Sequence, residues 1–428
     1  MSLMMRLLRD LVPLNRVLCS TDYDKTIECL LDVLPFRVHE YPATMEHNGW
    51  VIPPKWDVVD AKIVKDGKVV YDALEHPLRV IALSGSYAGR VSLDELRRHV
   101  HVDARYDDAV TFHFRQQFRP WARDWGFCMP KHTLEQLAPG DYDVTIETRE
   151  SPGMLKILEY TQPGAIEETI AFGGNLDHPG VANDGLAGCV VGIELLRRLR
   201  GQRTKYTYKL VLVQGIIGSE YYLAHLPPSD KTRLLECVFL EMLGSRTPLA
   251  LQTSRDNRSN IERVLQRTLH ETGTQHRVGP FQSIIINDEY IWENHGIPTV
   301  SLSRFPYPEY HCDKDNLQII SEASLDEALN VLTASVDSMN RSPLVRKRFQ
   351  GNICLSNPRY NLYIDPGQVA IGDIPDPNRR KMRYLMDLIP SLSRPVTVAN
   401  LAAQVDLPEG AVQSYVERWA DRGLLELR

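Results

Sequence analysis

The pattern of apolar residues changes along the chain, and each change marks a different kind of element. In residues 22–34 apolar side chains recur at helical spacing, with Ile27, Leu30, Leu31 and Leu34 on one face. That spacing predicts an amphipathic helix near the N-terminus.

From residue 47 to residue 130 the pattern favours short strands and turns. Apolar and polar residues alternate on both sides of Lys65-Asp66-Gly67-Lys68, a sequence typical of a tight hairpin. A second pair of strands is predicted in residues 79–92, and aromatic residues crowd into 118–127. We expect a small β-rich domain over 47–130. Its aromatic cluster either lines a substrate site or packs the domain against the rest of the chain.

Beyond residue 141 strands and helices alternate. Short apolar runs predict strands, the last two of them at 283–287 and 298–303. Helices are predicted over 185–200, 257–272 and 321–340. This alternation favours an α/β fold with a mostly parallel sheet flanked by helices.

Two further segments follow. Residues 351–377 are rich in proline and glycine and predict a linker. Residues 378–428 show three helical patterns and then a short apolar strand, the order of elements in a winged helix. We therefore expect a separate C-terminal winged-helix domain.

Composition and charge exclude several classes of protein. The chain has 428 residues, 43% of them hydrophobic and 24% charged, as in ordinary globular proteins. Its formal net charge of -6 argues against a protein that coats nucleic acid. No apolar run approaches the about 20 residues that span a bilayer, and no signal peptide is apparent. Seven cysteines without a C-x-x-C pair predict reduced thiols, so we expect a cytoplasmic protein with no membrane partner.

Three loops that follow predicted strands carry side chains suited to metal binding. His178 and Asp184 lie in the first loop, Glu241 ends the strand before the second, and His311 lies in the third. In an open α/β sheet such loops meet at the carboxyl edge. Imidazole and carboxylate ligands suit zinc, and an open coordination position lets the ion activate water for attack on a carbonyl. The sequence therefore predicts a hydrolytic zinc site formed by His178, Asp184 and His311.

Each of these residues also has a purely structural interpretation. Asp184 precedes a predicted helix, where a carboxylate caps the helix or favours its dipole. Asp313 and Asp315 either solvate a turn or orient His311. A single histidine in a loop is usually exposed and has no role, so the prediction depends on the loops converging.

The order of these motifs resembles the zinc aminopeptidase and glutaminyl cyclase superfamily. The segments that carry the resemblance are residues 175–199, 215–223, 239–244 and 310–316. A closer resemblance is to a branch of bacterial aminopeptidase-domain proteins, often linked to polysaccharide or secondary-metabolite gene clusters. That branch shares the motif His-Pro-x-x-Ala-Asn-Asp (178–184), the motif Trp-Gly-Phe-Cys (125–128) and Asp288-Glu289. The resemblance covers nearly the whole chain.

The resemblance implies a discontinuous domain architecture. A zinc aminopeptidase-like α/β domain would comprise residues 1–46 and 131–350. The small β domain would be inserted at 47–130, and the winged helix would follow at 378–428.

The resemblance also implies roles for individual residues. His178, Asp184 and His311 fall on metal-ligand positions, and Glu241 falls where two-zinc members have an aspartate ligand. The implied activity is that of a metal-dependent aminopeptidase or related amide hydrolase. Its substrate would be a peptide or a small amide.

The chain departs from the two-zinc members at one place. They carry two adjacent glutamates, a general base and a ligand, where this chain reads Leu212-Val213-Gln214-Gly215. We therefore expect one zinc ion rather than two. Hydrolysis still needs a general base. We predict Glu289 for this role, with Asp288, Glu241 and Glu220 as alternatives. Glu220 is equally explained as a carboxylate at a helix start, and Asp288-Glu289 as a charged turn.

Two other functions stay open from the sequence. The missing glutamates favour a metal-binding protein with altered chemistry that acts on a small molecule. The predicted winged helix is compatible with a DNA-binding regulator. However, residues 378–428 carry eight basic and six acidic side chains, and the recognition helix expected at 408–422 has three acidic and two basic ones. We therefore do not expect nucleic-acid binding, and we expect this domain to pack or to support a homo-oligomer.

Overall fold

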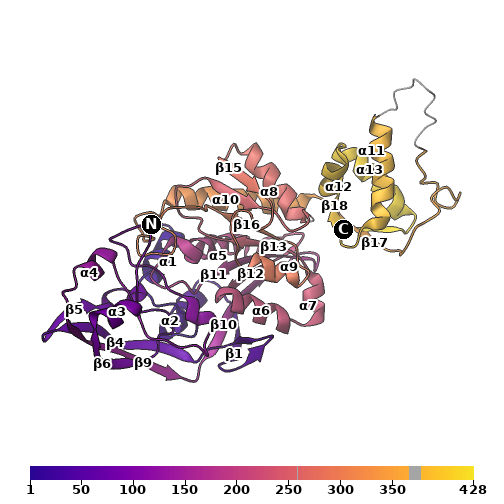
Figure 1. The fold of residues 1–428 in the computed structure, drawn as a ribbon. Coiled ribbons are helices and arrows are strands. Elements are labelled where there is room, and N and C mark those ends of the chain that lie inside the picture. Colours follow the sequence, from indigo (N-terminus) through magenta and orange to yellow (C-terminus); the bar gives the residue numbers. More distant parts are fainter. Residues whose placement is uncertain (258, 366–376) are drawn as a thin grey trace. The chain divides into compact units, whose positions relative to one another are not determined.

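The structure is a computed structural model that describes residues 1–257, 259–365 and 377–428 (Figure 1). The chain divides into two compact units. The first comprises residues 1–257 and 269–333. The second comprises residues 259–268 and the described residues from 334 onward. Among the described helices, none combines the length and the apolar character that a membrane crossing requires.

An eight-stranded mixed sheet forms the framework of the first unit, in the order β1-β10-β12-β11-β13-β16-β14-β15. The central strands β12, β11, β13 and β16 are parallel, whereas β1 and β10 pair antiparallel at one edge. This confirms the predicted α/β class. The strands are β1 (Arg37–Pro42), β10 (Met154–Gln162), β11 (Thr169–Asn175), β12 (Thr207–Val213), β13 (Leu234–Leu240), β14 (Leu249–Gln252), β15 (His276–Gly279) and β16 (Thr299–Ser303).

Helices cover both faces of this sheet, which is why its central strands are apolar throughout. Alternate residues such as Ala171, Val213 and Phe239 pack with α6 and α9. The intervening residues Leu210 and Leu240 face α5, where Gly192 leaves them room. The helices of this unit are α1 (Leu3–Leu11), α2 (Thr21–Leu31), α5 (Gly188–Leu199), α6 (Gly215–His225), α7 (Pro228–Arg233) and α9 (Glu289–Asn294), and two further helices, α8 (Asn260–Glu271) and α10 (Glu322–Arg341), have residues in both units.

One predicted strand of this sheet is absent. Residues 283–287 form turns and irregular structure, and Ile286 is 69% exposed. The side chain of Gln252 accepts hydrogen bonds from the backbone N–H groups of Ile284 (2.9 Å) and Ile285 (3.1 Å). Because a side chain satisfies these donors, they are not available to a neighbouring strand. The prediction that Asp288-Glu289 follows a strand is therefore wrong.

A second sheet, with the order β5-β4-β9-β6, contains most of the predicted β-rich segment. The hairpin predicted at 65–68 joins β4 to β5, whereas residues 79–92 give one strand instead of two. The central strand β9 comes from beyond residue 130. The strands of this sheet are β4 (Lys55–Lys65), β5 (Lys68–Asp72), β6 (Tyr87–Ser92) and β9 (Asp141–Ser151), and near them in sequence are two separate strand pairs, β2 (Glu46–His47) with β3 (Trp50–Val51) and β7 (Val100–His101) with β8 (Phe127–Cys128), and the helices α3 (Leu93–Arg98) and α4 (Lys131–Glu135).

The second unit has three C-terminal helices and a three-stranded antiparallel sheet in the order β18-β17-β19. Within the predicted linker, Leu355 and Leu362 are buried in this unit's core, and residues 366–376 lie outside the described residues. The winged-helix interpretation and the domain boundaries stay predictions. The elements are β17 (Leu344–Lys347), α11 (Pro377–Leu388), β18 (Val396–Thr397), α12 (Val398–Val405), α13 (Glu409–Asp421) and β19 (Leu425–Leu427).

Candidate metal centre

A sharp bend between β11 and α5 carries the first two predicted ligands. After β11 the chain passes His178 and enters a short π-helical turn, residues 183–187, before α5 begins. Asp184 has extended backbone angles (φ -68°, ψ 112°), and Gly185 has φ 73°. A Cβ at Gly185 would lie 2.3 Å from the carbonyl oxygen of Asn175, so a side chain does not fit there. Neither the turn nor α5 has a side-chain cap, so Asp184 is not a helix cap.

The third predicted ligand, His311, lies in the loop after β16 in a left-handed conformation (φ 59°). Its ring stacks on Tyr310 with centroids 3.8 Å apart. Its carbonyl oxygen accepts a hydrogen bond of 2.9 Å from the backbone N–H of Phe112. A strand-end loop of the large sheet is thereby fixed to a segment that lies between β1 and β10 in sequence.

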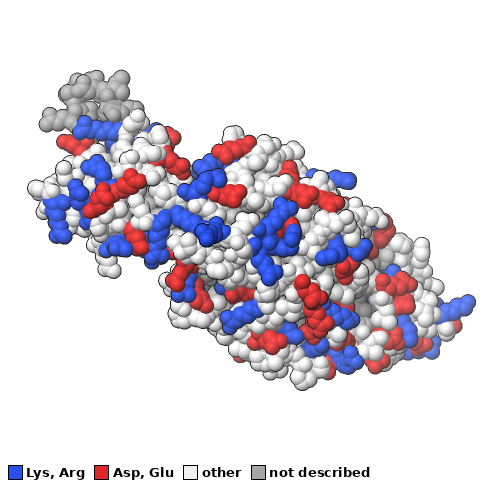
Figure 2. All heavy atoms as spheres, turned by 180° about the vertical axis from the view of Figure 1, so that it is seen from behind, with Lys and Arg blue, Asp and Glu red and all other residues white. Residues whose placement is uncertain are grey.

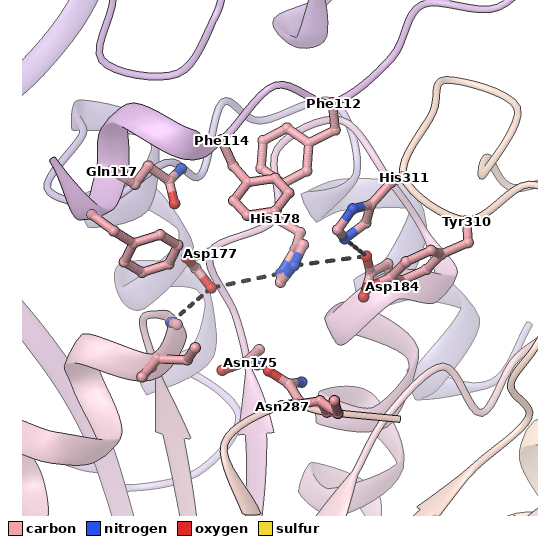
Figure 3. A pocket seen from close by; sticks show the side chains of 14 residues that line it. Phe112, Phe114, Gln117, Asn175, Asp177, His178, Asp184, Asn287, Tyr310 and His311 are labelled. Atoms are coloured by element: carbon pink, nitrogen blue, oxygen red, sulfur yellow. Dashed lines mark hydrogen bonds and ion pairs between the residues drawn. The ribbon is translucent and has the colours of Figure 1, made fainter. Parts of the chain in front are cut away.

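The three predicted ligands converge on one point (Figure 3). His311 Nε2 lies 3.1 Å from Asp184 Oδ2, and His178 Nε2 lies 3.7 Å from the same oxygen. One ligand atom from each residue falls within 4.8 Å of the other two. Tetrahedral zinc ligands at bond lengths of about 2.0–2.2 Å are separated by roughly 3–3.5 Å. Small side-chain adjustments would bring all three to these separations, so the residues fit a zinc ion.

The electrostatics favour an ionised Asp184 next to the two imidazoles. Burial alone would raise its pKa, but the charge of His178 and the hydrogen bond to His311 outweigh burial and lower it. A carboxylate that keeps its negative charge is the form that binds a metal ion.

Asp315 holds the ligand-bearing bend in place. Its carboxylate is fully buried and accepts hydrogen bonds from the backbone N–H groups of Asn183 (2.6 Å) and Asp184 (2.9 Å). The hydroxyl of Tyr307 donates to the same carboxylate at 2.6 Å. Asp315 was expected either to solvate a turn or to orient His311. Neither interpretation describes this contact, because the Asp315 carboxylate orients Asp184. Asp313 instead accepts a hydrogen bond from the backbone N–H of Val110.

A second support was not predicted. Arg16 is fully buried, and its guanidinium donates hydrogen bonds to the carbonyl oxygens of Leu176 (3.2 Å), Val181 (3.2 Å) and His178. These hydrogen bonds from Arg16 attach the loop that carries His178 to the N-terminal segment. In the sequence Arg16 only interrupts an apolar stretch, and no local pattern marks it as part of the site.

The converging residues open into a pocket with an empty volume of about 590 Å³. In Figure 3, Phe112 and Phe114 lie on one side of the pocket, and Asn175 and Asn287 lie on the opposite side. Phe118, from the predicted aromatic cluster, reaches the pocket, whereas Trp125 and Phe127 pack in the core of the smaller sheet. The lining residues are Phe112, Phe114, Gln117, Phe118, Asn175, Asp177, His178, Asp184, Gly215, Ile216, Ile286, Asn287, Tyr310 and His311.

The predicted general bases are buried and do not line this pocket. Glu241, Asp288 and Glu289 are each at most 2% exposed. Burial raises the pKa of all three, to about 6 for Asp288, and their mutual repulsion adds to the effect for Glu241 and Glu289. Asp184 also contributes to the raised pKa of Glu241, so this carboxylate cluster lies close behind the ligands.

The alternative base Glu220 lies elsewhere. Its carboxylate pairs with His295 at 3.0 Å and with His47 at 3.3 Å. Glu220 lies in the middle of α6 and not at its start, so the interpretation as a helix-start carboxylate is wrong, and its role here is the pairing with these two histidines.

Comparisons with known proteins agree with this fold. Residues 5–342 match the family described as "Domain of unknown function (DUF4910)". The "Putative polysaccharide biosynthesis protein with aminopeptidase-like domain" of Clostridium acetobutylicum is 24% identical over 328 residues, which cover 75% of this chain and 74% of that protein.

Two solved structures extend the comparison. The crystal structure of a "putative peptidase" from Clostridium acetobutylicum has a TM-score of 0.77 at 20% identity, covering 99% of this chain and 96% of that one. BSAP, a zinc aminopeptidase from Bacillus subtilis, has a TM-score of 0.59 at 12% identity, covering 78% of this chain and 94% of that one. The chain therefore shares the fold of these structures, one of which is a zinc aminopeptidase.

Proposed function

This chain belongs to the DUF4910 family, and we propose that it is a zinc-dependent hydrolase that cleaves an amide bond. An aminopeptidase acting on a peptide, or a related hydrolase acting on a small amide, fits the pocket best. The observation that carries the proposal is the approach of His178 and His311 to a single oxygen of Asp184.

The residues around that oxygen have two roles, metal binding and positioning of the ligand loop. His178, Asp184 and His311 would hold one zinc ion, while Asp315 and Arg16 keep the loop of Asp184 and His178 in position. The ion would supply Lewis acidity toward the substrate carbonyl and would lower the pKa of water. Phe112 and Phe114 border the site and reduce its access to bulk water.

We keep Glu289 as the first candidate for the proton acceptor. Glu289 is buried with one carboxylate oxygen, Oε2, bonded to the backbone N–H of Asn287 at 3.1 Å. Because Asn287 lines the pocket, this bond connects Glu289 directly to the pocket wall. Asp288 and Glu241 are the alternatives.

Metal analysis combined with an amidase assay tests the proposal. We expect one zinc per chain, chelator-sensitive cleavage within a panel of aminoacyl and amide substrates, and loss of both in His178→Ala, Asp184→Asn and His311→Ala. His132→Ala, which removes an exposed histidine, is the matched control. A wild-type protein that binds no divalent metal, or variants that keep it, would contradict the proposal. Two ions per chain would contradict its single-ion part.

A second candidate function is supported by residues 212–215. This stretch brings no carboxylate to the pocket. Gly215 lines the pocket, and so does Ile216, which follows it. A protein that binds zinc but transforms a small molecule by other chemistry would show full metal occupancy without amide cleavage. Cleavage that is abolished in Glu289→Gln, with zinc retained, would exclude this candidate.

A further inference from the structure

Exposed apolar side chains gather at one edge of the smaller sheet. Val69 (57% exposed) and Val70 (39% exposed) are consecutive residues of β5, an edge strand. Leu74, in the short 3-10 helix Ala73–Glu75 that follows β5, is exposed as well. Single exposed apolar residues are ordinary, but a group of them along one strand marks an interaction surface.

An irregularity in the ladder accounts for the two exposed valines. Val64 of β4 pairs with Val69 and Ile63 pairs with Tyr71, so Val70 has no opposite residue in β4. Strict alternation would bury one of two successive side chains. Here Tyr71 is buried and both valines are exposed, as the extra residue of a β-bulge permits. The bulge therefore presents to solvent an apolar pair that the sheet itself does not use.

The outer side of β5 has no strand next to it. In the order β5-β4-β9-β6, β5 is hydrogen-bonded to β4 alone, and in the view of Figure 1 it lies at the margin of the first unit. An edge strand presents unpaired N–H and C=O groups along its free side. Among the described residues, the backbone groups of 68–71 bond to nothing other than β4. Only the carbonyl oxygen of Asp72 has a further donor, the guanidinium of Arg79 (2.6 Å).

Two other sheet edges of the first unit are protected in ways that β5 is not. β1 ends in Pro42 and carries the exposed charges of Arg37 and Glu40. β6 carries the exposed side chain of Arg90. Proline and charged side chains are common means by which edge strands avoid pairing. A bulge is another such means, but two exposed valines within the bulge of β5 favour association.

Charges of opposite sign stand at the two ends of β5. Lys68 is its first residue, Asp72 is its last, and both are exposed. Lys68 has no ion pair within the described part of the chain. Asp72 uses Oδ1 to accept a hydrogen bond of 2.9 Å from the backbone N–H of Leu74. At about 3.3 Å per residue, Lys68 and Asp72 lie roughly 13 Å apart, too far to pair with each other.

A second copy of this chain matches all of these features. In antiparallel pairing about a two-fold axis, the first residue of one strand comes close to the last residue of the other. With the axis at the valines, Lys68 of each copy lies beside Tyr71 and Asp72 of the partner subunit. Val69 and Val70 of the two copies then lie side by side. Because a two-fold contact repeats every interaction, the opposite charges meet twice.

We propose that the chain forms a homodimer in which the β5 strands of two copies pair antiparallel, with Val69, Val70 and Leu74 as the apolar contact. The smaller sheet then continues from one copy into the other. A contact built on one short strand is small, so the dimer forms at micromolar rather than nanomolar concentrations. This inference is independent of the metal site and of the proposed function.

Sedimentation velocity of the full-length chain over a wide range of concentrations tests the proposal. We expect a monomer–dimer equilibrium in wild type. Val70→Asp places two like charges next to each other at the centre of the contact, and should raise the dissociation constant by about tenfold or more. Val278→Asp is the matched control, because it also puts a carboxylate at an exposed valine of an edge strand, β15, and it should leave the dimer unchanged. Both positions are exposed, so both variants should keep the wild-type circular dichroism and melting temperature.

A charge exchange tests the direction of pairing. Lys68→Asp and Asp72→Lys each bring like charges together, so each variant alone should self-associate more weakly than wild type. In an equimolar mixture opposite charges meet again at both ends, and a mixed dimer should form with about wild-type affinity. Asp72→Lys also loses the bond to Leu74, so the recovery in the mixture is the decisive measurement.

Other outcomes would overturn the inference. Wild type that stays monomeric at every concentration would exclude the dimer. A dimer that survives Val70→Asp, or that Val278→Asp weakens equally, would exclude β5 as the contact. A mixture that dimerises no better than either variant alone would exclude antiparallel pairing. Zinc content and amide cleavage are measured separately, so none of these outcomes decides the proposed function.

Discussion

The carboxylate of Asp315 accepts a hydrogen bond of 2.9 Å from the backbone N–H of Asp184, so one buried aspartate positions another. Asp315 lies four residues after His311 and thus connects the third ligand loop to the first. Burial raises its pKa to about 7, although the bonds from Tyr307, Asn183 and Asp184 favour its charged form. The separations within the predicted metal site depend on this contact.

Replacing Asp315 should therefore weaken metal binding without removing a ligand. In Asp315→Asn the amide retains one acceptor oxygen but presents N–H groups toward backbone donors. We expect zinc affinity to fall roughly 10- to 100-fold, the usual effect of losing a residue that supports a ligand. Competition with a zinc chelator measures this. Asp313→Asn, which alters a neighbouring aspartate bonded to Val110, is the control, and an equal loss in both variants would contradict the assignment.

Arg16 should contribute to stability even without metal. Arg16→Met keeps much of the side-chain length but leaves the carbonyl oxygens of Leu176 and Val181 without their donor. We expect the free energy of unfolding of the metal-free protein to fall by about 2–4 kcal/mol. Urea denaturation measures it. Arg9→Met, at a position whose side chain is 58% exposed, should change stability by less than about 0.5 kcal/mol. Similar values for the two variants would show that Arg16 has no supporting role.

The buried carboxylates should make stability depend on pH. Burial raises the pKa of Asp288 to about 6, above the value of about 3.9 expected in the unfolded chain. The folded state then binds the proton more tightly, so this stabilisation is complete below about pH 4 and is lost as pH rises through 6. Asp288→Asn removes the titration. Between about pH 4 and pH 7, metal-free wild type should lose on the order of 2–3 kcal/mol relative to this variant. Parallel pH profiles in urea denaturation would refute the raised pKa.

The second unit should not bind DNA through α13. Arg418 in α13 donates a hydrogen bond to the carbonyl oxygen of Asn361 (3.0 Å), and Arg422, directly after the helix, donates to that of Tyr360 (3.3 Å), so both basic side chains are already hydrogen-bonded. On the face drawn in Figure 2, basic and acidic side chains are interspersed. We expect no shift with genomic fragments in a gel assay, even at roughly 50 mM salt, where phosphate contacts are strongest. Binding that weakens steeply with added salt would revive the regulator hypothesis.

The sequence was sufficient for the parts of the site that depend on local pattern. Strand ends mark where loops meet, so His178, Asp184 and His311 were expected together, and the structure brings them together. The alternation of helices and strands likewise predicted the class of the large sheet. In each case the residues of a short segment are enough to predict the feature.

The rest depends on contacts between segments far apart in sequence. The alternation of apolar and polar residues in β9 would suit a strand of the large sheet or of the smaller one. Only its pairing with β4 and β6 assigns β9 to the smaller sheet. Residues 283–287 have the apolar composition of a strand. However, the backbone N–H groups of Ile284 and Ile285 donate hydrogen bonds to the side-chain oxygen of Gln252 instead of to a neighbouring strand. Arg16 meets the loop it supports 160 positions later. No periodicity records such long-range contacts.

The backbone bond from Phe112 to His311 ties the aromatic wall to a ligand loop, although the two are encoded almost 200 positions apart. Because this bond joins two backbone groups, the side chains of the aromatic wall can be changed without removing it. A graft of residues 110–118 from a relative that keeps the bonds of Val110 and Phe112 to residues 311–313 would present different side chains to the pocket beside unchanged predicted ligands. Under the proposed function, such a graft would change which substrates the pocket accepts and leave the three predicted ligands in place.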